Sequence, residues 1–234
     1  MNRSSTLYQT LREALATPGC PLCRLATASG RRYLDSLLFE SVNDPDIRAK
    51  LATAFGFCGR HHREMLTFQG ERLGVAIIER ALLSEALTRL GGAGRSGTTG
   101  AGLGSMTRRR WPRWGGAVPP GSAVSETACP ACAQEVEAVQ RLLPVLLKHL
   151  EGDLEGPLRE AGGLCWLHLR QTLAATANAR TRTLLLTLHR QAWEELAGHL
   201  DEFIRKRDYR YSHEPVTAVE AQAIEDAMGA LSGK

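Results

Sequence analysis

Cysteines and histidines in two repeated motifs carry most of the chemistry that this sequence can perform. Each half of the chain contains a CPxC motif that is followed by a GxCxxH motif. Residues three apart lie on one face of a helix or turn, so each pair can present two donors to a single ion. Soft thiolates combined with imidazole suit zinc, whose structural sites are tetrahedral. The motifs therefore predict metal binding, with two zinc ions per chain.

We assign one metal site to each half of the chain. The first site consists of Cys20, Cys23, Cys58 and His61, and the second of Cys129, Cys132, Cys165 and His168. Pairing across the halves, with Cys20 and Cys23 joining Cys165 and His168, uses the same residue types. Spacing alone does not separate the two arrangements.

The same residues could support chemistries other than zinc binding. Three thiolates and one imidazole can also hold an iron–sulfur cluster. A CPxC pair can act as a redox dithiol, but that role needs a strand–helix context that the sequence does not show. A filled four-ligand zinc site leaves no position for substrate or activated water, so we lean towards a protein that is not an enzyme.

His62, next to His61, is a possible substitute ligand. We expect it instead to point to the other side of the helix and to be solvated, because the second half has Leu169 at the corresponding place. The remaining histidines have no partner at comparable spacing and are expected to be surface or packing residues, namely His149, His189, His199 and His213.

The chain that must position these motifs is predicted to be all-α and internally duplicated. The segment 91–125 is rich in Gly, Ser and Pro and should be a flexible linker. We expect a first metal-binding helical repeat over 1–90, a second over 126–206, and a C-terminal tail and helix over 207–234. The fold is then two short helical bundles, each pinned by its metal.

Helix signals support this interpretation. Val75, Ile78 and Leu82 fall at helical steps, as do Leu185 and Leu188. Two helix starts are predicted, one at Asp44-Pro45 and one from a capping box at Thr217 and Glu220. Pro144 should kink or break a helix that runs from about 134 to 150.

The charge and composition of the chain indicate its cellular compartment and its possible binding partners. The net charge is +4, but the segment 91–125 contains five arginines and no acidic residue. The rest of the chain therefore has a net charge of about −1. A basic and aromatic cluster, Arg108 to Trp114, could bind nucleic acid or an acidic protein, or could simply keep the linker soluble. No apolar run is long enough for a membrane span or a signal peptide. Six cysteines, three per half, fit metal ligation better than disulfides, so we expect a cytoplasmic protein without membrane contact.

The segment after the second repeat is dense in charged and aromatic groups. Arg207, Asp208 and Arg210 could form an anion pocket, but an ion-pair lock that joins the two halves is the favoured interpretation.

The doubled CPxC and GxCxxH pattern and the closing FxRKxDYRY…EP segment resemble an uncharacterised bacterial family of metal-binding helical proteins. The resemblance covers nearly the whole chain outside 91–125. It implies the helical, metal-binding architecture and no particular activity. The expected function is a zinc-binding helical scaffold that binds another macromolecule.

Overall fold

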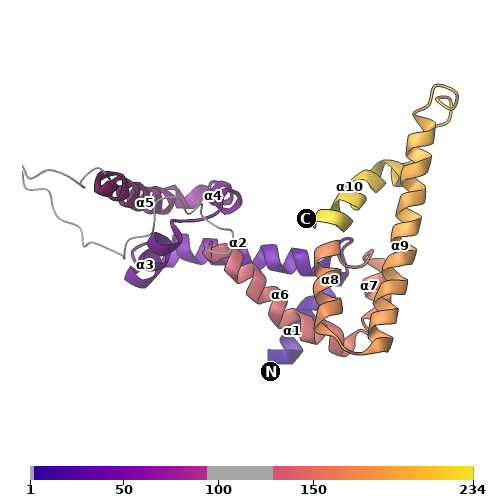
Figure 1. Ribbon diagram of the computed structural model, residues 1–234, viewed down its shortest axis with the longest axis horizontal. Coiled ribbons are helices and arrows are strands. Elements are labelled where there is room, and N and C mark those ends of the chain that lie inside the picture. Colours follow the sequence, from indigo (N-terminus) through magenta and orange to yellow (C-terminus); the bar gives the residue numbers. More distant parts are fainter. Residues whose placement is uncertain (1–2, 94–128, 234) are drawn as a thin grey trace, which may run out of the picture. The chain divides into compact units, whose positions relative to one another are not determined.

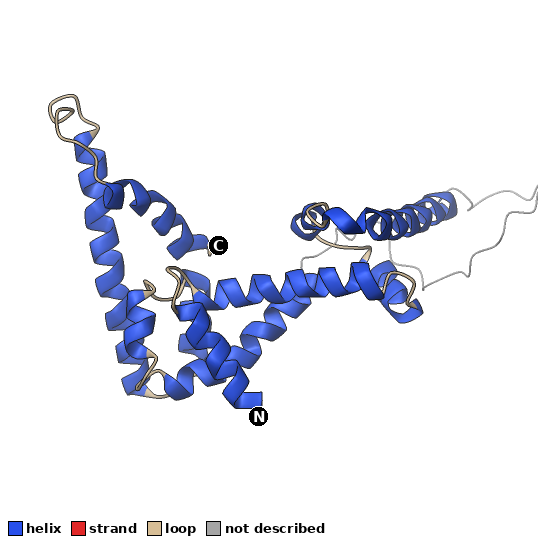
Figure 2. Cartoon of the chain, turned by 180° about the vertical axis from the view of Figure 1, so that it is seen from behind, coloured by secondary structure: helices blue, strands red, loops and turns tan. Residues whose placement is uncertain are grey.

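The computed structural model describes residues 3–93 and 129–233, and all regular structure in these ranges is helical (Figure 2). The predicted all-α fold is confirmed. The first range contains α1 (Arg3–Leu15), α2 (Pro21–Glu40), α3 (Pro45–Ala54), α4 (Gly59–Met65), the short 3₁₀ helix η1 (Gln69–Glu71) and α5 (Arg72–Ala93). The second contains α6 (Pro130–His149), α7 (Glu155–Glu160), α8 (Trp166–Ala175), α9 (Ala179–Lys206) and α10 (Ala218–Ser232). Across both ranges, none of the helices combines the length and the apolar character that crossing a bilayer requires.

Helix starts follow local chemistry. The Asp44 carboxylate accepts hydrogen bonds from the backbone N–H groups of Asp46 and Ile47, and Pro45 opens α3. Thr217 and Glu220 form a capping box at the start of α10. Both predicted starts are confirmed.

Pro144 does not break its helix. α6 is continuous from Pro130 to His149. Proline removes one backbone donor and crowds the preceding turn, which usually costs about 3 kcal/mol in a helix interior. The side chains around it are buried, among them Leu142, Val145 and Leu146, so packing offsets that cost.

The helices belong to two compact units, each described here by itself. Unit 1 combines residues 1–28 with 135–234, and unit 2 comprises residues 29–134. Each unit therefore contains residues from both halves of the sequence, which the expected repeats 1–90 and 126–206 do not. The predicted linker 91–125 lies outside the described residues except for its first three, which end α5.

Unit 1 has a leucine-rich core. α10 packs on α9 and α8, and α1 packs on α7 (Figure 1). The fully buried side chains of this core include Leu11, Leu22, Leu146, Leu150, Leu154, Leu158 and Leu185. Burying a leucine contributes about 1.5–3 kcal/mol, so this core is the main source of stability for unit 1 apart from any metal.

Unit 2 has a smaller core of more mixed composition. α3 packs on α5, and buried side chains from α2, α4 and α5 meet there. The members of this core are Leu34, Leu37, Leu38, Leu51, Phe57, Met65, Ile78, Leu82, Cys129 and Ala131. Because Cys129 belongs to it, the core of unit 2 includes a residue of the second CPxC motif.

Candidate metal centres

The four donors of cluster 1 come from the starts of two helices in unit 1. Cys20 precedes α2 and Cys23 lies in its first turn, while Cys165 is the N-cap of α8 and His168 lies in the first turn of that helix. The Nδ1 atom of His168 is 3.4 Å from the Sγ of Cys20, 3.2 Å from that of Cys23 and 3.3 Å from that of Cys165. The Sγ atoms of Cys23 and Cys165 are 3.5 Å apart. All four donor atoms lie within 4.8 Å of one another.

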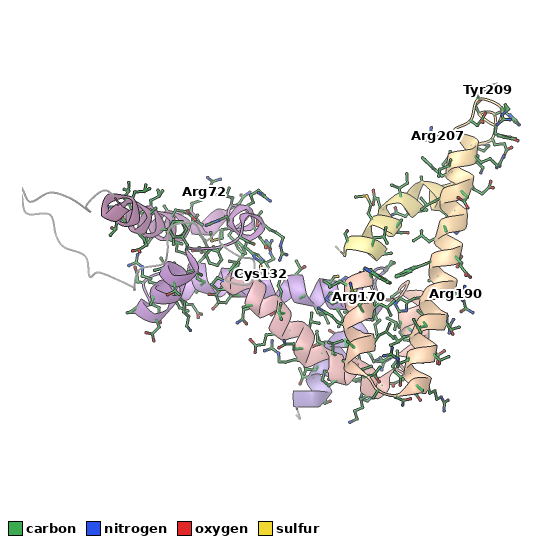
Figure 3. The ribbon with its side chains drawn as sticks, viewed as in Figure 1. Arg72, Cys132, Arg170, Arg190, Arg207 and Tyr209 are labelled. Carbon is green, nitrogen blue, oxygen red and sulfur yellow. The ribbon has the colours of Figure 1, made fainter. Side chains whose placement is uncertain are left out.

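Cluster 2 repeats this arrangement in unit 2. Cys58 is the N-cap of α4 and His61 lies in its first turn, while Cys129 precedes α6 and Cys132 lies near its start (Figure 3). The Nδ1 of His61 is 3.3 Å from the Sγ of Cys58, 3.3 Å from that of Cys129 and 3.4 Å from that of Cys132. The Sγ atoms of Cys58 and Cys132 are 3.7 Å apart. These four donors also lie within 4.8 Å of one another.

The pairing of the motifs differs from the assignment of one site to each half. The CPxC of the first half meets the CxxH of the second half in cluster 1, and the CPxC of the second half meets the CxxH of the first half in cluster 2. Each cluster still has three cysteines and one histidine. Both halves offer the same donors at the same spacing, so only the long-range course of the chain distinguishes the two arrangements.

The donor distances fit a single tetrahedral ion. With Zn–S bonds of about 2.3 Å and Zn–N bonds of about 2.0 Å, a tetrahedron has S···S edges of about 3.8 Å and S···N edges of about 3.5 Å. The observed Sγ···Sγ distances of 3.5 and 3.7 Å and Sγ···Nδ1 distances of 3.2 to 3.4 Å are close to these values. A cluster with several irons binds its thiolates to different metal atoms and needs more widely spaced donors. The geometry therefore favours one ion in each cluster.

The thiols in each cluster compete for protons. Hydrogen bonds with Cys20 and Cys23 lower the pKa of Cys165, and the hydrogen bond with Cys165 raises the pKa of Cys23. Burial alone would raise the pKa of Cys129, but hydrogen bonds from His61 and the backbone lower it to about 6. Each cluster therefore has one thiol that ionises readily, and a bound cation would displace the protons shared by the others.

A glycine turn places the first ligand of each CxxH motif. Gly56 and Gly163 have φ values of 90° and 87°, a left-handed region that favours glycine. Two residues later, Cys58 and Cys165 have almost identical N-cap geometry, with φ −68° in both and ψ of 161° and 163°. The local likeness explains the shared GxCxxH pattern, while a duplication of the whole half remains a prediction.

His189 is the residue at this site whose role the sequence did not reveal. It is buried in α9, and its Nε2 accepts a hydrogen bond of 2.7 Å from the backbone N–H of Leu164, the residue before Cys165. Burial lowers its pKa, which keeps the ring neutral. A lone histidine without a spaced partner gives no signal of this kind in a single sequence.

Two further predictions about this region need correction. His62 was expected to lie outside the metal site, and it is not a member of cluster 2. It is only partly solvated, however, because its ring packs against Phe57 and its Nε2 is 3.2 Å from the Oε1 of Glu79. Within the tail, Arg210 pairs locally with Asp208. Such short-range pairs within unit 1 do not form the expected lock between the two halves.

The tail of α9 contributes to unit 1 in another way. Arg205 forms ion pairs with Glu202 in α9 and with Glu214 in the loop that follows α9. Lys206 forms an ion pair with Glu220, and this pair ties α9 to α10. Arg207 and Tyr209 lie just beyond the C-terminal end of α9 (Figure 3). The Cζ atom of Arg207 is 4.8 Å from the centre of the Phe203 ring, over which the guanidinium stacks. The predicted partner-binding cluster Arg108–Trp114 lies outside the described residues.

Comparison with known proteins places the chain in a family. Residues 9–234 match the model of the family of unknown function DUF6062. An uncharacterised 23.9 kDa protein in the xynA 3′ region of Caldicellulosiruptor sp. (strain Rt8B.4) is 25% identical over 216 residues, which cover 92% of this chain and 95% of that protein. No solved structure is significantly similar to the chain. Because the family model spans nearly its whole length, the chain belongs to the DUF6062 family.

Proposed function

We propose that this protein is a zinc-binding helical scaffold with two structural sites, one in each unit. The observation that carries the proposal is the convergence of three thiols and one imidazole, all within 4.8 Å of one another, in both cluster 1 and cluster 2. Buried thiolates are costly without a compensating cation, and Cys129 and Cys165 are both buried. A zinc ion would supply that charge and join two helix starts that lie far apart in the sequence.

The coordination in each cluster supports a structural role. Four protein donors complete a tetrahedral zinc site, whereas catalytic zinc sites have three protein ligands and an open position. The metal's binding energy would then act as folding energy for the unit. Ligation also requires reduced thiols, and all six cysteines are free, which supports a reducing compartment such as the cytoplasm.

The scaffold part of the proposal concerns an unknown macromolecular partner. Apolar side chains on α5 support it, since Leu83 and Leu87 lie four residues apart and are 63% and 67% exposed. An acidic protein or a nucleic acid that binds through Arg108–Trp114 is the partner we propose to test. Binding to such a partner should weaken steeply with salt, and replacement of Arg108, Arg109 and Arg110 by Ala should remove that dependence.

Metal content per chain is the measurement that tests the zinc proposal. Protein purified without oxygen should contain close to two zinc ions per chain by elemental analysis and show no visible absorption band. The alternative is an iron–sulfur or thiol redox protein that uses the same ligands. Iron with acid-labile sulfide and a brown colour would establish that alternative and overturn the zinc scaffold.

A further inference from the structure

His189 clamps the turn that delivers Cys165 to cluster 1. Its side chain is 1% exposed, and its two ring nitrogens bond to backbone groups on either side. Nε2 accepts from the N–H of Leu164 at 2.7 Å, and Nδ1 lies 2.7 Å from the carbonyl oxygen of Leu185. These partners assign the proton to Nδ1 and leave Nε2 as an acceptor. The ring therefore links the backbone before a metal ligand to the interior of α9.

The His189 ring also packs closely against the glycine turn. A Cβ atom added at Gly163 would stand 2.8 Å from Nε2 of His189, closer than real Cβ contacts allow. The imidazole thus fills the space beside the glycine turn. With hydrogen bonds at both nitrogens and its ring close against Gly163, His189 holds Leu164 and hence Cys165 in place beside the other three donors.

Unit 2 has no such clamp at the corresponding position. Leu82 stands as far along the chain from Cys58 as His189 does from Cys165, and it contacts the matching turn, since a Cβ at Gly56 would lie 2.8 Å from the Cδ1 of Leu82. Leu82 shares this space with the His62 ring, which would be 3.4 Å from the same Cβ, and has no acceptor to offer to the N–H of Phe57. Side-chain packing thus supports the glycine turn in both units. Only in unit 1 does the residue at this position also form a hydrogen bond with the turn.

A second, independent feature shields cluster 1. Gly233, at the end of α10, lies against the thiols, since a Cβ there would be 2.8 Å from the Sγ of Cys23 and 3.6 Å from that of Cys165. α10 is held in place by the nearly buried Lys206–Glu220 ion pair. Gly233 therefore covers part of cluster 1 and restricts the approach of chelators and thiol reagents to Cys23 and Cys165, while Cys20 and Cys23 stay partly exposed.

From these contacts we infer that His189 is a positioning residue that makes cluster 1 the tighter metal site, so that unit 2 releases its metal first. The inference rests on the proposed function, because it assumes that both clusters bind metal. Removal of supporting hydrogen bonds around metal ligands typically weakens metal affinity by about 10- to 100-fold, and a difference of that order is expected between the two sites. Metal supply would then control the folding of unit 2 while unit 1 stays intact.

The order of metal release in the native chain is the first test. Full-length protein loaded with two zinc ions is incubated with increasing concentrations of EDTA, and free thiols are labelled with N-ethylmaleimide and mapped by peptide mass spectrometry. Cys58, Cys129 and Cys132 should become labelled at about 10- to 100-fold lower EDTA concentration than Cys20, Cys23 and Cys165. Simultaneous labelling of both sets, or the reverse order, would overturn the inference. If zinc protects neither set, the proposed function itself fails.

Variants at one position then test the role of His189. His189→Leu copies the residue that unit 2 has at Leu82. In this variant the EDTA concentration at which the cluster 1 cysteines become labelled should fall by about 10- to 100-fold, towards the concentration that exposes cluster 2. His189→Gln keeps an oxygen acceptor for the Leu164 N–H and should restore much of the protection. His199→Leu makes the same change at a more exposed place on α9 and should alter neither cluster. Equal protection of cluster 1 in His189→Leu and wild type would contradict the inference.

Discussion

Unit 1 and unit 2 hold the same set of metal donors but surround it differently. In unit 1, fourteen buried apolar side chains form the core, His189 bonds to the backbone next to Cys165, and Gly233 lies beside the Sγ of Cys23. In unit 2, ten buried residues form the core, and one of them is the ligand Cys129. The core of unit 2 is thus smaller and includes one of its candidate metal donors. The comparison shows that two identical sets of candidate donors are built into cores of different size.

The largest expected effect comes from removal of a single ligand. Cys165→Ser should reduce the metal content from two ions to one and expose Cys20 and Cys23, its partners in cluster 1, while Cys129 and Cys132 stay protected. Loss of structural zinc removes on the order of 10 kcal/mol of binding energy, so unit 1 should lose its cooperative fold. Thiol labelling and circular dichroism measure both outcomes.

Cys58→Ser provides the matched variant in unit 2. It should expose Cys129 and Cys132 and leave Cys20 and Cys23 protected. The reverse pattern in both variants would show that each half of the sequence forms its own site after all.

Core truncations come next in size and compare the two units directly. Leu146→Ala in unit 1 and Leu34→Ala in unit 2 each remove a fully buried side chain and should each cost about 2–5 kcal/mol of unfolding free energy. The same loss is a larger share of the stability of the smaller core. In denaturant unfolding of the zinc-loaded protein, we therefore expect unit 2 of Leu34→Ala to unfold at a lower denaturant concentration than unit 1 of Leu146→Ala. Coincident transitions would argue that the two units unfold as one.

Helix caps should give smaller effects of equal size in both units. The side chains of Asp44 in unit 2 and Asn178 in unit 1 each accept two backbone N–H groups at a helix start. Replacement of either residue by Ala should cost about 1 kcal/mol. Thermal unfolding measures the effect on each unit, and unequal costs would show that the caps are supported by different surroundings.

The smallest effect is expected from acid titration of the pair that holds α10. A hydrogen bond from Lys206 lowers the pKa of Glu220 below its ordinary value of 4.5. The pair therefore contributes its full stability above pH 4.5 and loses it as the pH falls through the lower folded pKa. The difference in unfolding free energy between wild type and Glu220→Gln should be constant above pH 4.5 and shrink below it. Unit 2 lacks this pair, so its own transition should show no such difference between the two proteins.

Much of the local structure could be predicted from the sequence. The Asp44-Pro45 start, the capping box of Thr217 and Glu220 and the helical periodicity of Leu185 and Leu188 all depend on interactions within a few residues. Such interactions are encoded by neighbouring residue types and can be read locally. The effect of Pro144 was less predictable, because the continuity of α6 depends on packing against distant side chains.

The candidate ligands were also identifiable, but the role of His189 was not. Cys and His at a spacing of three are recognisable because the spacing itself brings donors together. His189 acts on Leu164 across 25 positions of sequence, through a hydrogen bond that exists only once α9 folds back beside α8. No local pattern marks a histidine of that kind.

The sequence by itself determined the helical class, the eight candidate donors and their division into sets of three cysteines and one histidine. Only the tertiary structure decided which CPxC meets which CxxH, because the two halves carry equal donors at equal spacing and differ in nothing that a metal would sense. The choice depends on the course of α2 and α6, because each of these helices contributes residues to both units. That course is fixed by the burial of side chains far apart in the sequence, a long-range property that no short motif contains.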